Sequence, residues 1–172
     1  MADNLMQPMG EDTLKTDAAL SPCRKYRYAL WRKWDAAKPD AMIIGLNPST
    51  ADETADDPTV TRCIAFARSW GYGGLCIGNL FAFRATEPAD LLLAGDPIGP
   101  ENNEWLIKLA RHAGVVVAAW GNHGSHSGRS EQIIQLIPVL HYLKINKTGE
   151  PAHPLYLKAN LRPKPLETYG AR

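Results

Sequence analysis

Three short runs of apolar residues do most to limit the folds that this chain can adopt. They are residues 41–46, 75–81 and 115–120, and each is apolar at almost every position. A strand that is apolar on both faces is typical of a parallel sheet covered by helices on both sides. A fourth run, residues 140–145, alternates between apolar and polar residues, and we expect it near an edge of the sheet.

Helical patterns fill the gaps between these runs. Asp57 followed by Pro58 is typical of a helix start, with Asp57 as the N-cap and proline at the first helical position. Gly71 is suited to end that helix. Residues 101–113 and 129–136 repeat the apolar spacing of a helix that packs one face on a core.

The alternation of strands and helices predicts an α/β fold with right-handed crossovers. We expect a three-layer αβα sandwich around a central, mainly parallel sheet of four to five strands, with residues 23–34 packed as an added strand or helix. The length of 172 residues suits one domain, which we place at residues 21–172. Residues 1–20 are polar and rich in small residues, and are predicted to be a mobile tail.

Cysteine usage and hydropathy exclude several classes of protein. The three cysteines form no C-x-x-C pair, which argues against a disulfide framework, a zinc ribbon and an iron–sulfur cluster. No apolar run approaches the roughly 20 residues that span a bilayer. The start of the chain lacks the basic and apolar regions of a secretory signal. We therefore expect a cytoplasmic protein with reduced thiols, no cofactor, no membrane association and no evident protein partner.

Charge is unevenly distributed although the formal net charge is only +1. Basic residues crowd residues 24–38 and 144–164, whereas residues 40–59 hold five acids and no base. Two basic segments could follow a phosphate backbone, but a solvated surface explains them equally well. The chain contains neither a P-loop nor a G-x-G-x-x-G motif, so nucleoside triphosphate or dinucleotide use has no support.

Polar segments follow each of the four predicted strands, at residues 45–50, 79–86, 120–129 and 147–156. Ligands of open α/β sheets bind beyond the carboxyl ends of the strands. Because these ends meet at one edge, we expect the amides, hydroxyls, arginines and histidine of the four segments to converge there. Their convergence is a stronger signal than any single motif.

Three side chains are the main candidates for chemistry at that edge. Asn47 either caps its G-L-N-P turn or holds a water molecule. Asn79, at a buried strand end, is either a structural staple or a reader of a planar polar ligand. His153, between prolines, is either a surface histidine or a donor to a developing anion. Asp57 is better explained as a helix cap, so the predicted site is poor in acids and bases.

The loop before the third predicted helix holds His123 and His126, a spacing that suggests a metal ion. No carboxylate follows in that loop. The simpler interpretation is that its glycines let the backbone approach a phosphate at the helix N-terminus, assisted by Arg129. We therefore predict no metal site, and no G-x-S-x-G elbow of a hydrolase is present.

Four short motifs occur in the order and spacing of the uracil-DNA glycosylase superfamily, which the chain resembles from about residue 41 to residue 158. The motifs are Gly45-Leu-Asn47-Pro48, Gly78-Asn79 followed by Arg84, Ala119-Trp120-Gly121, and His153-Pro154. Ser49 and Leu155 depart from the glycine and serine that the family carries there. The whole sequence is also similar to an uncharacterised bacterial and phage domain family with G-L-N-P-S-T-A-D and H-P-L-Y-L motifs.

The resemblance implies a glycosylase-like fold and a role for each matching residue. Asn47 would position the attacking water, and His153 would stabilise the leaving base. The implied substrate-binding residues are Gly45, Leu46, Pro48, Ser49, Asn79, Phe81, Phe83, Trp120 and Tyr156. The implied phosphate-binding residues are Arg84, Gly121, Arg129 and Lys158.

These observations favour a DNA glycosylase-like hydrolase that cleaves the N-glycosidic bond of a modified or mismatched pyrimidine. Its partner would be DNA, single-stranded or modified. The first alternative is a non-catalytic protein that binds a nucleobase or nucleic acid on the same fold. The second is a nucleotide-processing enzyme with a metal at His123 and His126.

Overall fold

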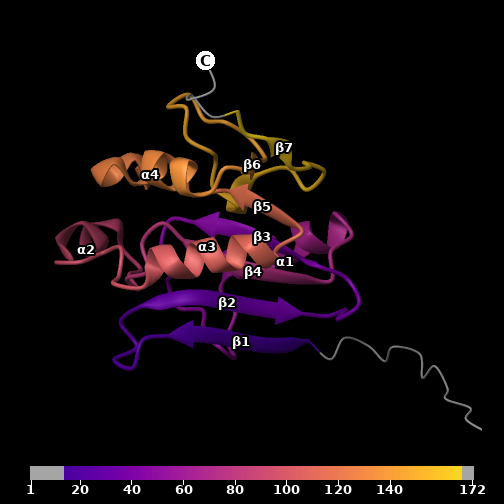
Figure 1. Cartoon of the computed structure of the whole chain (residues 1–172), viewed down its shortest axis with the longest axis horizontal. Helices are drawn as coiled ribbons and strands as arrows, with labels where there is room; N and C mark the ends of the chain where they lie inside the picture. The colour runs from indigo at the N-terminus through magenta and orange to yellow at the C-terminus, as the bar shows by residue number, and fades with distance from the viewer. Residues whose placement is uncertain (1–13, 168–172) are drawn as a thin grey trace, which may run out of the picture.

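The three apolar runs form the parallel centre of the sheet in the computed structural model, which describes residues 14–167. They become β4 (Gly74–Asn79), β3 (Asp40–Gly45) and β5 (Val115–Ala118), in this spatial order (Figure 1). The fourth run contributes β6 (His141–Tyr142), which pairs with β5 in parallel. The predicted α/β class is therefore confirmed.

The sheet is larger and more mixed than predicted. It has seven strands in the order β1-β2-β4-β3-β5-β6-β7. The added strands β1 (Lys15–Leu20), β2 (Arg27–Lys33) and β7 (Lys164–Pro165) each run antiparallel to a neighbour. The prediction of four to five strands was too low because β1 and β7 are polar edge strands, and these leave no continuous apolar run.

The segment interpreted as a mobile tail ends earlier than predicted. Residues 15–20 form β1 and pair along β2 from Lys15↔Lys33 onward, so the prediction was wrong for them. The rest of the predicted tail, residues 1–13, lies outside the described residues.

Helices lie on both faces of the sheet. On one face, α1 (Pro58–Ser69) packs over β3, β4 and β5. On the other, α3 (Asn102–His112) and α4 (Arg129–Leu136) pack side by side, with the short α2 (Pro88–Leu93) near the strand ends (Figure 1). Within β3 the side chains alternate, so Met42 and Ile44 meet α3 and α4, whereas Ile43 meets α1.

Local signals set the start and end of α1 as predicted. The Asp57 side chain accepts a hydrogen bond from the Val60 amide at 2.9 Å, and Pro58 occupies the first turn. Gly71 follows the helix with φ of +87°, a conformation that glycine adopts without strain. This N-terminus of α1 lies at the same edge of the sheet as the ends of β3 and β4.

A β-bulge in β2 sets which face its arginines occupy. Ala19 pairs with Ala29 but Leu20 pairs with Arg27, so Tyr28 is an extra residue. A bulge re-aims the side chains on one side of it. Arg27 and Arg32 are five positions apart and would otherwise lie on opposite faces. With the bulge, both lie on the α1 face.

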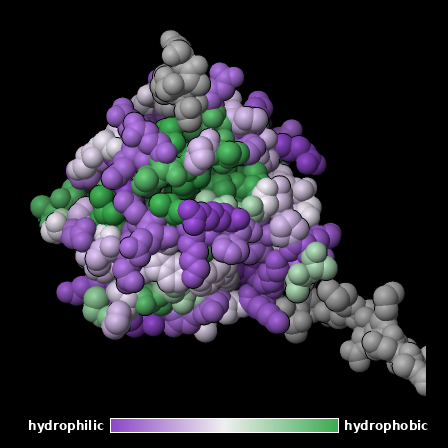
Figure 2. Space-filling view, viewed as in Figure 1, coloured by the Kyte–Doolittle hydropathy of each residue, from purple (hydrophilic) through white to green (hydrophobic). Residues whose placement is uncertain are grey.

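The opposite face is drawn in Figure 2, where apolar and charged side chains share the surface over α3 and α4. A shallow groove there is lined by Ile107, Ala110, Leu136 and Val139. None of the helices within residues 14–167 has the length and apolar character needed to cross a membrane.

Candidate functional site

A pocket of about 190 Å³ lies at the carboxyl ends of β3 and β4, on the α1 face of the sheet. Apolar walls come from Ile43, Ile77 and Val60. The polar residues that carry the argument below also line it: Arg27, Asn47, Ser49, Asp57, Asn79 and His153. Three of the four polar segments predicted to converge therefore reach one pocket, and Gly45 and Leu46 line it as well.

Asn47 is fixed by its amide nitrogen. Nδ2 donates to the carbonyl oxygens of Ala85 at 2.7 Å and of Pro48 at 3.0 Å. Both amide hydrogens are thus used, and Oδ1 is the group left to accept a hydrogen bond in the pocket. Asn47 is both a local turn residue and a pocket residue. Its neighbour Pro48 is buried, and the group of Pro48 that bonds to Asn47 is the carbonyl oxygen.

Asn79 is the most informative residue of the pocket. Its side chain is 3% exposed, and Nδ2 has no hydrogen-bond partner among the described residues. Leaving a buried donor unpaired costs about 1–3 kcal/mol. Gly45 gives the amide room, because a Cβ there would lie 2.9 Å from Oδ1 of Asn79. The amide is therefore confined at the pocket wall with a donor available to a ligand.

His153 presents one nitrogen of defined character. Its Nδ1 accepts the Leu155 amide hydrogen at 3.2 Å as the N-cap of the short helix η2 (Pro154–Tyr156). In the neutral ring the proton is therefore on Nε2, which makes Nε2 a donor. Burial lowers the pKa of His153, against the opposing effect of the Asp57 charge, and this favours the neutral form.

Sequence reasoning missed two charged residues of the pocket. Asp57 was assigned only to the helix cap, but its carboxylate also lines the pocket because α1 begins beside the loops after β3 and β5. Arg27 reaches the pocket through the β2 bulge. Burial lowers the pKa of Arg27 to about 10, so it stays charged at neutral pH. The cap motif offered a signal for Asp57, but the basic stretch around Arg27 offered none that separates it from its neighbours.

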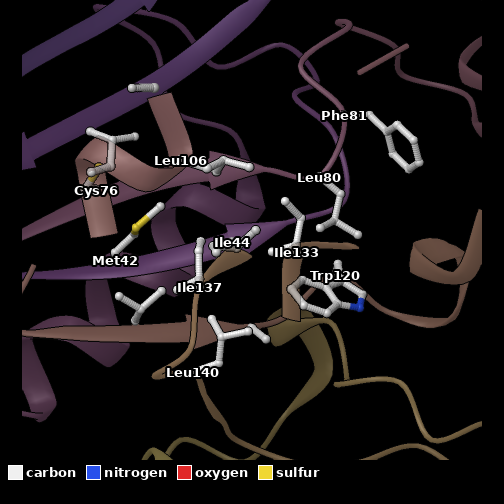
Figure 3. Close-up of a cluster of buried hydrophobic side chains, with 14 of the residues drawn as sticks. Met42, Ile44, Cys76, Leu80, Phe81, Leu106, Trp120, Ile133, Ile137 and Leu140 are labelled. Carbon is white, nitrogen blue, oxygen red and sulfur yellow. The ribbon is translucent and has the colours of Figure 1, made fainter. Parts of the chain in front are cut away.

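Two aromatic residues predicted to bind the substrate lie outside the pocket. Phe81 is fully buried in the core cluster of the α3 and α4 face (Figure 3). Its ring centroid lies 5.8 Å from that of His126. Trp120 is 1% exposed on the same face and donates from Nε1 to Glu150 Oε2 at 2.6 Å. Neither ring lines the pocket, because each packs in the core on the other face of the sheet.

Two residues predicted to bind phosphate are used inside the fold. Arg129 is fully buried, and it donates to the Leu80 carbonyl at 2.7 Å and to Gln132 at 2.6 Å. The Gly121 amide donates to the Pro151 carbonyl at 2.8 Å. These bonds hold α4 and the loop that carries His153, and neither residue lines the pocket, although Nη2 of Arg129 has no partner among the described residues.

Four other predicted residues lie outside the pocket, two of them in an adjoining groove. Phe83 and Arg84 line an open groove of about 480 Å³ that shares Ser49 with the pocket. Tyr156 is 91% exposed in η2, just after His153, and Lys158 is exposed beyond it. None of these four side chains lines the pocket itself, whose polar lining includes the two amides, Asp57, Arg27 and His153.

The histidine pair considered for a metal does not form a site within the described part of the chain. His123 is exposed, and His126 packs against the Phe81 ring within η1 (Asn122–Gly128). Among residues 14–167, no three histidine, cysteine, aspartate or glutamate side chains gather as metal ligands would.

The family model described as "Protein of unknown function (DUF1643)" matches residues 27–155. The chain belongs to this family. The match includes every pocket residue named above, from Arg27 to His153. No curated protein and no solved structure matches the chain. Because the description of the DUF1643 family states no activity, function has to be argued from the site.

Proposed function

We propose that this DUF1643 protein is a glycosylase-like hydrolase that binds a pyrimidine in the pocket and cleaves its N-glycosidic bond. The observation that supports this most is the convergence of Asn47, Asn79 and His153, from three separate loops, on one pocket. Their order along the chain is the one that resembles the uracil-DNA glycosylase superfamily. At about 190 Å³ the pocket is smaller than the roughly 300–1,000 Å³ typical of drug-sized ligands, so it suits a single ring.

Recognition of the base would depend on hydrogen bonds more than on aromatic stacking. The free Nδ2 of Asn79 would donate to a ring oxygen or nitrogen. Ile43 and Ile77 would supply aliphatic contact in place of the aromatic platform that Phe81 does not provide. A ligand that satisfies Asn79 removes the cost of its unpaired donor, which favours planar rings with acceptors on their edge.

Departure of the base would be assisted by His153. As the C–N bond breaks, its electron pair passes to the ring, and negative charge develops on a ring oxygen. The Nε2–H of the neutral imidazole would donate to that oxygen. Loss of one such donor typically lowers the rate about 10²–10³-fold.

Attack by water would use Asn47 together with Asp57. Oδ1 of Asn47 would accept one hydrogen of the water, and the Asp57 carboxylate would accept the proton released as the water oxygen bonds to the anomeric carbon. The amide cannot take up that proton, so the carboxylate supplies the base that the sequence prediction lacked. Asp57 can act in this way while its other oxygen caps α1.

The remainder of the substrate would occupy the adjoining groove. Arg84 would contact a phosphate there, and Phe83 would contact the sugar or a neighbouring base. Tyr156, which lies outside the groove lining and is 91% exposed, would be free to contact a longer substrate. A base within a duplex would have to be flipped out, which costs a few kcal/mol and least for a damaged or unpaired base. Single-stranded or modified DNA is therefore the expected partner.

The experiment that tests this function is base release. Single- and double-stranded oligonucleotides with a panel of modified and mismatched pyrimidines would be incubated with the protein, and abasic sites and free base quantified. Asn47→Ala and His153→Ala should each lose about 10²–10³ in rate. His123→Ala is the matched control, because it removes an exposed histidine outside the pocket and should change nothing. Release that survives both pocket substitutions would contradict the mechanism.

A second candidate is a non-catalytic protein that binds nucleobases or nucleic acid. It is favoured by the unpaired donor of Asn79, which would hold a base whether or not chemistry follows. In that case Asn79→Ala would weaken binding of oligonucleotides, and no substrate would yield free base.

A further inference from the structure

Strand β2 carries two buried arginines on the α1 face that differ sharply in their partners. Arg32 is fully buried, and its Nε pairs with Asp56 at 2.7 Å. Its remaining donors reach four carbonyl oxygens, those of Asp17, Trp31, Asp52 and Ala55. Arg32 is thus paired in full and holds the loop before α1 in place.

Arg27 is 3% exposed but has a single partner. Its Nη1 donates to the Ala51 carbonyl at 2.8 Å, and Nε is buried with no partner among the described residues. It forms no ion pair with any residue of the described range 14–167. Burying a charged group without an ion pair is costly. Arg129 shares this feature, because its buried Nη2 also lacks a partner among the described residues, but of the two arginines Arg27 is the one that lines the pocket, where a ligand can meet it.

The other polar groups of the pocket define what could enter. Nδ2 of Asn79, Nε2 of His153 and Nε of Arg27 are all donors. Against these three donors, the acceptors are Oδ1 of Asn47 and the Asp57 carboxylate. The ligand must therefore present several acceptors, and the group that meets a buried guanidinium is best matched by an anionic oxygen.

Asp57 offsets this positive charge only in part, because its charge raises the pKa of Arg27 against the larger lowering by burial. Its carboxylate is not ion-paired with Arg27, and it accepts the Val60 amide hydrogen at the N-terminus of α1. There the helix dipole stabilises a negative charge. The Arg27 guanidinium thus remains available to a ligand.

We infer that Arg27 forms an oxyanion subsite, and that the ring bound in the pocket carries an anionic oxygen group such as a carboxylate. The inference rests on the proposed base pocket and adds the charge of its ligand. An oxyanion on the ring is favoured over a phosphate because Arg27 lies within the ring-sized pocket. Arg84, in the open groove, is the arginine placed for a phosphate.

Calorimetric titration of the full chain would test the subsite with three probes. These are uracil, uracil carboxylated at either ring carbon, and inorganic phosphate. Wild type should bind a carboxylated ring about 10- to 100-fold more tightly than uracil, as expected for a hydrogen bond between charged groups. Arg27→Gln should abolish this preference, whereas the matched control Arg84→Gln, which changes an arginine outside the pocket, should keep the preference.

The outcomes distinguish a failure of the oxyanion subsite from a failure of the proposed base pocket. Equal affinity of wild type for both rings would overturn the oxyanion subsite but leave the base pocket standing. If phosphate binding requires Arg27 and wild type shows no preference for a carboxylated ring over uracil, the inference that the anionic group is carried by the ring would be overturned. Failure of every ring to bind would overturn both proposals. Denaturant unfolding of Arg27→Gln, with Arg27→Met as a second variant, would show that any loss is not a failure to fold.

Discussion

The two faces of the sheet end differently at the same edge. On the α3 and α4 face, Phe81 and Trp120 (Figure 3) lie in a closed corner together with Arg129. Trp120 and Arg129 both bond within the chain there, although Nη2 of Arg129 has no partner among the described residues. On the α1 face, Arg27 and Asn79 border an open corner, the pocket, where buried donors lack partners. The closed corner stabilises the fold, whereas the open corner gives up stability to keep donors available for a ligand.

The prediction with the largest expected effect compares how much a residue of each corner contributes to the free energy of unfolding. Trp120→Ala should lower the free energy of unfolding by about 3–5 kcal/mol, because it empties a packed position and removes the bond to Glu150. Asn79→Leu, of similar volume, should leave stability within about 1 kcal/mol or raise it, since it removes an unpaired donor. Denaturant unfolding measures both. Equal losses would mean that the open corner is as much a part of the core as the closed one.

The second prediction compares two arginines of the same strand. Arg32→Met should destabilise the protein by about 2–4 kcal/mol, because it leaves the carbonyls of the 52–56 loop and the Asp56 carboxylate without their partner. Arg27→Met should cost less than about 1 kcal/mol or stabilise, since an unpaired buried charge is replaced by an apolar chain. Thermal and denaturant unfolding would show the difference, and a larger loss in Arg27→Met would reject the claim that its charge lacks a partner.

Alternation along a strand explains why part of the open corner was predictable. Gly45 lies two residues beyond Ile43, and Asn79 two beyond Ile77, so each faces α1 with its predecessor. Phe81 was assigned to the same site, but the chain leaves β4 after Asn79, and beyond that point alternation no longer fixes direction.

The residues that sequence reasoning missed depend on long-range structure. Arg27 reaches the pocket because of a bulge at Tyr28, and a bulge has no local signature in this strand. Asp57 was identified correctly as a helix cap, yet its place in the pocket depends on α1 beginning beside the loop that carries His153. Contacts between elements, rather than local propensity, decided both cases.

Substitutions of Asp57 can separate its structural role, as the N-cap of α1, from its proposed chemical role as the base that accepts a proton from water. Asp57→Asn should change the free energy of unfolding by only a few tenths of a kcal/mol, because asparagine caps a helix about as well as aspartate. Asp57→Ala should cost about 1 kcal/mol through loss of the cap. Base release should fall in both variants, since neither can accept a proton from water. Full activity in Asp57→Asn would restrict Asp57 to the cap and remove the base from the proposed mechanism.

The smallest expected effect tests the protonation state of His153. Burial lowers its pKa in the folded protein, so the unfolded chain binds more protons over the range between the folded and unfolded pKa values. Wild type should therefore lose stability relative to His153→Gln as the pH falls below about 6.5, the ordinary value for histidine, and the loss should level off below the folded pKa. The proton would occupy Nδ1 and remove the acceptor of the Leu155 amide. Denaturant unfolding of both proteins across this pH range gives the difference in their free energies of unfolding directly.

A difference that does not change with pH would mean that His153 is protonated as easily in the folded chain as in the unfolded one. The open corner would then lack the neutral donor on which the proposed departure of the base depends.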